Sequence, residues 1–158
     1  MSLTQPISSD HQLARLLQIG IVLEEVIEAR AGKHATATDT DAELRDLLEE
    51  ASAESADHRR RLEALVDDLD ADTVPFEEIK MLVEAQYEAD EDFDGVLYDQ
   101  LCNEETAYKF YDDLVASIEA SDTAFGIDRE QLLDVLVAIR EEEAAGVEDV
   151  TELMEARQ

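Results

Sequence analysis

LRDLLEEASAESADHRRRLEALVDDL, residues 44–69, is the stretch that decides the fold. Alternating steps of four and three residues along it trace the stripe that one helix presents to a helix bundle. The stripe is apolar at both ends and small or polar in the middle. Its members are Leu44, Leu48, Ala51, Ser55, His58, Leu62, Leu65 and Leu69. The stretch therefore predicts one helix of a bundle whose interior is polar at mid-height.

Three other stretches repeat this pattern, and each is again polar or small in the middle. Their stripes are Leu13, Leu17, Gly20, Glu24, Ile27 and Ala31; Leu97, Leu101, Glu104, Tyr108, Tyr111, Val115 and Ile118; and Leu132, Leu136, Ile139, Glu143, Gly146, Val150 and Leu153. Capping residues, glycines and Pro75 mark the ends of the segments, and DEDFDG (residues 90–95) marks a break. We expect one all-α domain over residues 1–158, with helices at about 10–31, 41–69, 75–90, 94–120 and 129–156.

The composition is strongly acidic, with 42 Asp and Glu against 12 Lys and Arg and a formal net charge of −30. Such a field repels phosphate, so nucleic acid and anionic membrane surfaces are not expected as partners. This excess of acidic over basic residues resembles that of proteins from cells with very high internal salt. In such cells the salt screens the repulsion between the carboxylates of one protein. Most of the carboxylates are expected to solvate the surface, and a carboxylate is informative only where the pattern calls for an apolar residue.

The cysteine content and the absence of an evident targeting signal both bear on the cellular compartment. Cys102 is the only cysteine, so neither an intrachain disulfide nor a cysteine-based zinc cluster can form. The start, MSLTQPISSD, does not read as a secretory signal, and no segment has the roughly 18 apolar residues of a membrane span. These features predict a cytoplasmic protein. The sequence leaves open whether it forms a homodimer.

Glu24, His58, Glu104 and Glu143 each lie within about four residues of the middle of their helix, or about 6 Å at ~1.5 Å per residue. If the helices pack as a bundle, three carboxylates and an imidazole converge in one buried layer. Converging buried acids need protons, hydrogen bonds or a cation to persist. Oxygen and nitrogen donors of these types suit iron, manganese or zinc.

The pattern resembles the ferritin-like superfamily, in its rubrerythrin-like branch. Its ligand set is one Glu on each of two helices and Glu-x-x-His on each of the other two. The matching stretches are IGIVLEEVIEA around Glu24, NEETAYKFYDDL around Glu104 and IREEEAAGVEDV around Glu143. The resemblance covers about residues 10–156 and implies a four-helix bundle with a long crossover connection, which would carry the helix at 75–90.

Two of the six ligands that the family implies are replaced. Ser55 stands where the Glu of the first Glu-x-x-His is expected, and Gly146 stands where the His of the second is expected. Glu54 lies four residues before His58 on nearly the same face and could supply the lost carboxylate. The expected ligands are therefore Glu24, Glu54, His58, Glu104 and Glu143, and they suit one ion better than two.

The sequence is compatible with several functions. The resemblance implies an iron or manganese centre with oxygen or peroxide chemistry, although catalysis itself is left open. The first alternative is a non-catalytic helical scaffold, or an oligomerising protein, that has lost the metal and needs no cofactor. The second is metal storage or buffering. In the simplest structural interpretation the acids lie on the surface, and His58 is a core-edge histidine that bonds Ser55 or Glu104.

Overall fold

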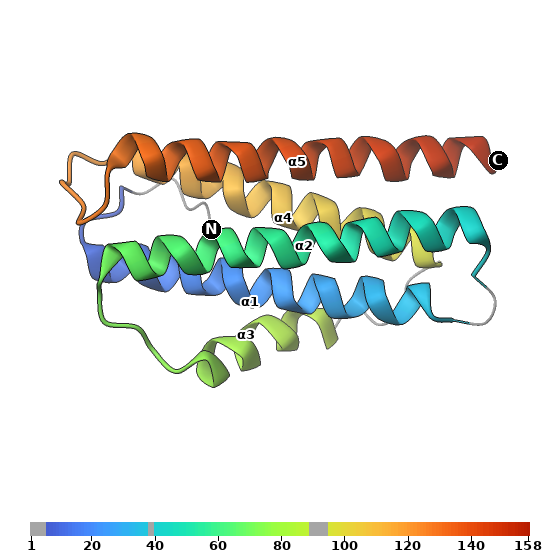
Figure 1. Cartoon of the computed structure of the whole chain (residues 1–158), viewed down its shortest axis with the longest axis horizontal. Coiled ribbons are helices and arrows are strands. Elements are labelled where there is room, and N and C mark those ends of the chain that lie inside the picture. Colours follow the sequence, from blue (N-terminus) through green and yellow to red (C-terminus); the bar gives the residue numbers. More distant parts are fainter. Residues whose placement is uncertain (1–5, 38–39, 89–94) are drawn as a thin grey trace.

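The computed structural model describes residues 6–37, 40–88 and 95–158 (Figure 1). Within these ranges the protein is all-helical and contains no strand. Its five helices are α1 (Asp10–Ala35), α2 (Ala42–Leu69), α3 (Phe76–Glu88), α4 (Val96–Glu119) and α5 (Arg129–Ala156). The expectation of an all-α chain is confirmed. The expected break at residues 90–95 lies outside the described residues except for Gly95, which precedes α4.

Side-chain caps fix the beginnings of three helices. Ser9 accepts a hydrogen bond from the backbone N–H of Gln12 at the start of α1, and Asp128 accepts one from Gln131 at the start of α5. The cap of α2 is Asp41, which accepts a hydrogen bond from the backbone N–H of Leu44. Such caps satisfy N–H groups that have no partner inside the helix. They explain why these three beginnings can be predicted closely from sequence.

The largest difference from the expected helix ends is at α1, which continues to Ala35 instead of ending at Gly32. The expected helix of residues 10–31 leaves His34 in the linker that follows, whereas in the structure His34 is helical. It lies in the last turn of α1, where its Nε2 is 2.9 Å from Oδ2 of Asp99 on α4. The glycine is followed by residues that remain helical, because its conformational freedom permits a helix end without imposing one.

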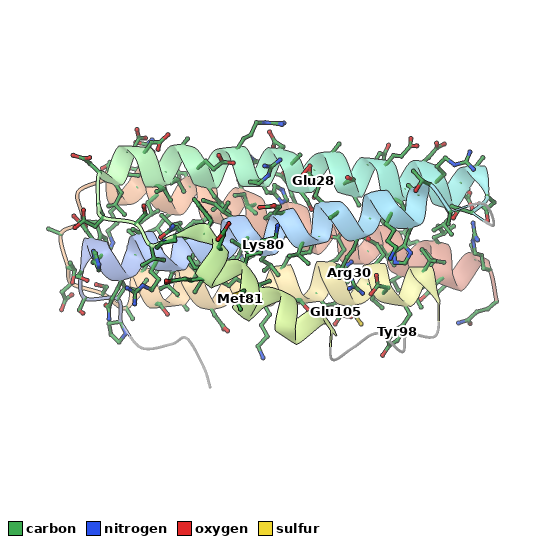
Figure 2. The ribbon with its side chains drawn as sticks, turned by 90° about the horizontal axis from the view of Figure 1, so that it is seen from below. Glu28, Arg30, Lys80, Met81, Tyr98 and Glu105 are labelled. Atoms are coloured by element: carbon green, nitrogen blue, oxygen red, sulfur yellow. The ribbon has the colours of Figure 1, made fainter. Side chains whose placement is uncertain are left out.

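Helices α1 and α5 run in one direction, and α2 and α4 run in the other (Figure 1). The pairs α1–α2 and α4–α5 form antiparallel hairpins, whereas the connection between α2 and α4 returns along the bundle and includes α3. Helix α3 lies outside the four long helices and buries Ile79 and Val83 toward α1. Figure 2 shows the face that carries α3, with Lys80 and Met81 on that helix. Lys80 lies 3.5 Å from Glu25 of α1.

The apolar interior has two parts. The larger includes Leu17, Leu62, Leu114, Leu136 and Ile139, and the smaller includes Ala35, Leu44 and Leu48 at the opposite end. On α2, α4 and α5 the segment between these two parts is polar. Its buried side chains are Ser55, His58, Gln100, Asn103, Glu104 and Glu143, with Glu24 facing them from α1. The fold thus places a polar layer between two hydrophobic clusters.

Candidate metal centre

His58 lies at the centre of the polar layer, with 0% of its surface exposed. Its Nδ1 is 3.1 Å from Oε2 of Glu24 on α1 and 3.0 Å from Oε1 of Glu143 on α5. Its Nε2 faces the opposite way and is 3.3 Å from Oε1 of Glu142. One imidazole therefore joins three helices, and each ring nitrogen faces carboxylate oxygen.

Glu24 is also fully buried, and its two oxygens have different surroundings. Oε2 accepts a hydrogen bond from the hydroxyl of Tyr111 on α4 at 2.5 Å, in addition to its contact with His58. Oε1 is buried and has no hydrogen-bond partner within the described part of the chain. A buried acceptor without a partner costs about 1–3 kcal/mol, so this oxygen is the clearest place in the cluster for a cation or a water molecule.

Glu104 and Glu143 are two buried acids joined by a hydrogen bond. Burial, helped by the hydrogen bond with Glu104 and opposed by the hydrogen bond with His58, raises the pKa of Glu143 to about 10. Burial also raises the pKa of Glu104. Oε1 of Glu104 accepts a hydrogen bond of 2.8 Å from Nε2 of Gln100. At neutral pH without a bound cation, Glu143 therefore keeps its proton and can donate it to Glu104.

The protonation of His58 is set by opposing effects. Burial lowers its pKa, but the hydrogen bonds to Glu143 and Glu24 and the charge of these acids outweigh burial and raise the pKa to about 10. Without a metal, the imidazole is therefore an imidazolium at neutral pH. Its positive charge partly balances the surrounding acids, whereas a metal ion at Nδ1 would have to displace this proton.

A second group of acids lies on the outer edge of the imidazole. Glu142 accepts two hydrogen bonds from Arg61, of 2.7 and 3.0 Å, and Arg61 is itself held by Asp57 at 2.7 Å. The Arg61 guanidinium lowers the pKa of Glu142. Oε1 of Glu54 is 3.8 Å from Nε2 of His58, and burial raises the pKa of Glu54 to about 7. This outer group orients the ring and is half-exposed to solvent.

Two sets of ligand atoms can be distinguished by distance. The atoms offered by Glu24, His58 and Glu143 lie within 4.8 Å of one another and are buried; those of Glu54, His58 and Glu142 satisfy the same distance but are more exposed. Metal–ligand bonds of about 2.0–2.2 Å for nitrogen and oxygen fit donors at such separations. The two sets use opposite ring nitrogens, so Glu54 lies at the other edge of the imidazole from Glu24 and Glu143.

The two replaced positions differ in their surroundings. Ser55 is buried, 4% exposed. A Cβ atom at Gly146 would lie 2.5 Å from Oε2 of Glu104, well inside van der Waals contact. The carboxylate of Glu104 therefore occupies the space beside Gly146 where a ligand side chain on α5 would begin.

Four of the five ligands expected from the sequence lie in the polar layer. Glu24, His58, Glu104 and Glu143 are all buried in the polar layer, so the interpretation with acids on the surface does not apply to these three acids. The simplest structural interpretation had His58 bonded to Ser55 or Glu104. In the structure His58 instead contacts Glu24, Glu143 and Glu142. Glu54 lies beside the other edge of the ring.

Other functional candidates were missed by sequence reasoning. Glu142 and Arg61 do not lie on the predicted stripes, although Glu142 neighbours Glu143 and Arg61 follows His58 by three residues. Gln100, four residues before Glu104, could have been found by helical spacing. Asp99 is buried where α4 was expected to present Leu97 and Leu101, and it pairs with Arg30 and His34. In the first turns of α4, the buried face is therefore rotated about the helix axis relative to the predicted stripe.

A scan against protein-family models and searches of curated proteins and of solved structures found no match to this chain. Among the residues that the structure describes, no helix combines the length and apolar character needed to cross a membrane.

Proposed function

We propose that the chain is a ferritin-like carboxylate-bundle protein with a reduced metal centre at mid-bundle that takes one iron or manganese ion. Glu24, Nδ1 of His58 and Glu143 would hold the ion, with Glu104 hydrogen-bonded to Glu143 beside them. Such a centre, when loaded, supplies oxygen or peroxide chemistry. The order of the helices supports the proposal, because two antiparallel hairpins are joined by a connection that returns along the bundle and includes α3.

The proposal rests on one observation: Oε1 of Glu24 is buried and has no hydrogen-bond partner in the described part of the chain. This oxygen lies on a fully buried side chain whose other oxygen already contacts His58 and Tyr111. A cation beside Oε1 would remove the cost of an unpaired acceptor and would replace protons on His58 and Glu143. The donor set of two carboxylates and one imidazole suits iron and manganese.

Within the centre, each side chain has a separate task. Tyr111 fixes the rotamer of Glu24 through its hydrogen bond. Glu142, held by Arg61, accepts from Nε2–H of His58 and so directs Nδ1 toward the two inner carboxylates. Glu104 accepts the hydrogen bond of the protonated Glu143, and the amide of Gln100 holds Glu104 in place by donating a hydrogen bond to its Oε1. Outer contacts of this kind fix ring orientation in metal-binding histidines.

A non-catalytic scaffold is the second candidate, and one observation favours it. His58 supplies a cation of its own, because the imidazolium contacts both Glu24 and Glu143. The pKa of His58, raised to about 10, keeps that cation in place at neutral pH. A cluster balanced in this way can persist without a metal, as a polar layer that fixes the register of the helices.

Elemental analysis of protein purified without chelator or affinity tag distinguishes the two candidates. The metal centre predicts close to one equivalent of iron or manganese, and Glu24→Gln should lose it while the helical circular dichroism is retained. Glu25→Gln is the matched control, because Glu25 is adjacent but pairs with Lys80 on the surface. Less than about 0.1 equivalent, unchanged after addition of Fe²⁺ or Mn²⁺, would favour the scaffold.

A further inference from the structure

A groove runs between α2 and α5 on the side of the bundle nearest the smaller apolar cluster, with a cavity volume of about 530 Å³. It follows α2 from Glu43 to Glu54, a length of about 16 Å at ~1.5 Å per residue. Small or apolar side chains, among them Ala51 and Val150, line its floor. The groove is therefore an open furrow along the seam between two helices, because side chains of both α2 and α5 line it.

The inner end of the groove reaches the candidate metal centre. Glu104 and Glu54 line it, although Glu104 is only 6% exposed. Glu104 is hydrogen-bonded to Glu143, and Glu54 is 3.8 Å from Nε2 of His58. Gly146 lines the same end, and because it has no side chain the carboxylate of Glu104 can lie against it. One carboxylate thus separates the groove from the buried cluster.

The charge of the groove has one sign. Seven of its 13 lining residues are acids and none is Lys, Arg or His, whereas the chain as a whole has 42 acids in 158 residues. Four acids of the rim, Asp46, Glu50, Asp149 and Glu152, form no ion pair in the described part of the chain. Two other grooves of similar volume in the described part of the chain each include a basic side chain, Arg157 in one and Lys109 in the other. Walls of a single sign concentrate counter-ions inside a cleft.

We infer that this groove is the route by which a hydrated divalent cation reaches the buried centre. The rim carboxylates attract the ion. At the inner end, carboxylate oxygens of Glu54 and Glu104 replace part of its hydration water. The absence of a side chain at Gly146 lets the carboxylate of Glu104 reach that end of the groove. This inference rests on the proposed metal centre and deepens it, since it assigns a function to acids that do not ligate the ion at rest.

Uptake of Co²⁺, followed by its visible absorption after rapid mixing, tests the route. In the groove variant, Glu50→Gln, Asp149→Asn and Glu152→Gln are combined. The control variant combines Glu63→Gln, Glu130→Gln and Asp134→Asn, three exposed acids of the same two helices outside the groove, and has the same net charge. We expect uptake about three- to tenfold slower in the groove variant than in the control at low ionic strength, with the equilibrium stoichiometry unchanged. The difference should shrink as salt is added.

A steric variant tests the same route without changing charge. Ala51→Leu narrows the groove between its inner and outer ends and should slow uptake at every salt concentration, again with full occupancy at equilibrium. Equal uptake rates in the groove variant, the control variant and Ala51→Leu, with Co²⁺ still bound, would overturn the route alone. If the unmodified chain binds no Co²⁺ at equilibrium, the proposed metal centre fails and the route fails with it.

Discussion

The hydroxyl of Tyr111 on α4 donates a hydrogen bond of 2.5 Å to Oε2 of Glu24 on α1. Both side chains are fully buried, and the two residues are 87 positions apart in the chain. Burial raises the pKa of Tyr111 well above its ordinary value, and the charge of Glu24 acts in the same direction, so the hydroxyl keeps its proton and remains a donor. This bond links the two helical hairpins at the level of His58.

Removal of that hydroxyl should destabilise the protein. Tyr111→Phe keeps the ring and its edge contact with Phe110, but it leaves Oε2 of Glu24 with His58 as its remaining partner. We expect the free energy of unfolding, measured with urea, to fall by about 2 kcal/mol. Tyr108→Phe, on the half-buried side of the same helix, should change it by less than about 0.5 kcal/mol. Equal effects of the two substitutions would show that the bond to Glu24 contributes nothing specific.

Glu142 should control metal affinity without ligating the metal at Nδ1. Glu142→Gln weakens the acceptor for Nε2–H of His58 and removes the charge that Arg61 holds in place. We expect the dissociation constant for Mn²⁺, measured by calorimetry, to rise by about 10- to 100-fold with one site retained. Glu141→Gln is the control, because Glu141 is exposed and pairs with Arg140. A response in Glu141→Gln as large as that in Glu142→Gln would contradict a positioning role.

The metal-free protein should lose stability as the pH rises from about 7 to 10. Glu143 and His58 both have a pKa of about 10 in the folded protein, above the ordinary values of 4.5 and 6.5. Raised pKa values favour the folded state at low pH, and this contribution is lost as the pH rises through the folded values. In excess chelator, the midpoint of thermal unfolding should therefore fall over this range.

Glu143→Gln provides the control for this pH dependence, since glutamine cannot lose a proton. The decline between pH 7 and 10 should be shallower in this variant than in the unmodified chain. A stability that is constant or increases over that range in the metal-free protein would mean that the buried acids and imidazole do not hold their protons as inferred.

Salt should stabilise the chain strongly. With a formal net charge of −30, the folded state carries a self-repulsion that screening reduces. We expect the urea midpoint to increase steadily between 0.1 and 2 M KCl. If added KCl left this midpoint unchanged, the interpretation of the acidic surface as an adaptation to high salt would be wrong.

Much of the candidate centre could be predicted from the sequence. The stripe through Leu48, His58 and Leu65 identifies one face of α2, because 3.6 residues per turn leave few choices of buried face. The same reasoning places Glu24 on the buried face of α1 and Glu143 on that of α5. It works less well on α4, where Asp99 and Asn103 are buried and Leu97 and Leu101 are only partly so.

The sequence by itself determined the existence of the helices, the caps at the beginnings of α1 and α5, and the faces that α1, α2 and α5 bury, since all of these depend on neighbours within a few residues. Only the tertiary structure decided that Nδ1 of His58 faces Glu24 and Glu143, that Glu54 and Glu142 lie at Nε2, and that His34 reaches Asp99. These relationships depend on the rotation and axial offset of one helix against another. Both are set by side-chain packing across the whole interface, which no local spacing in the chain encodes.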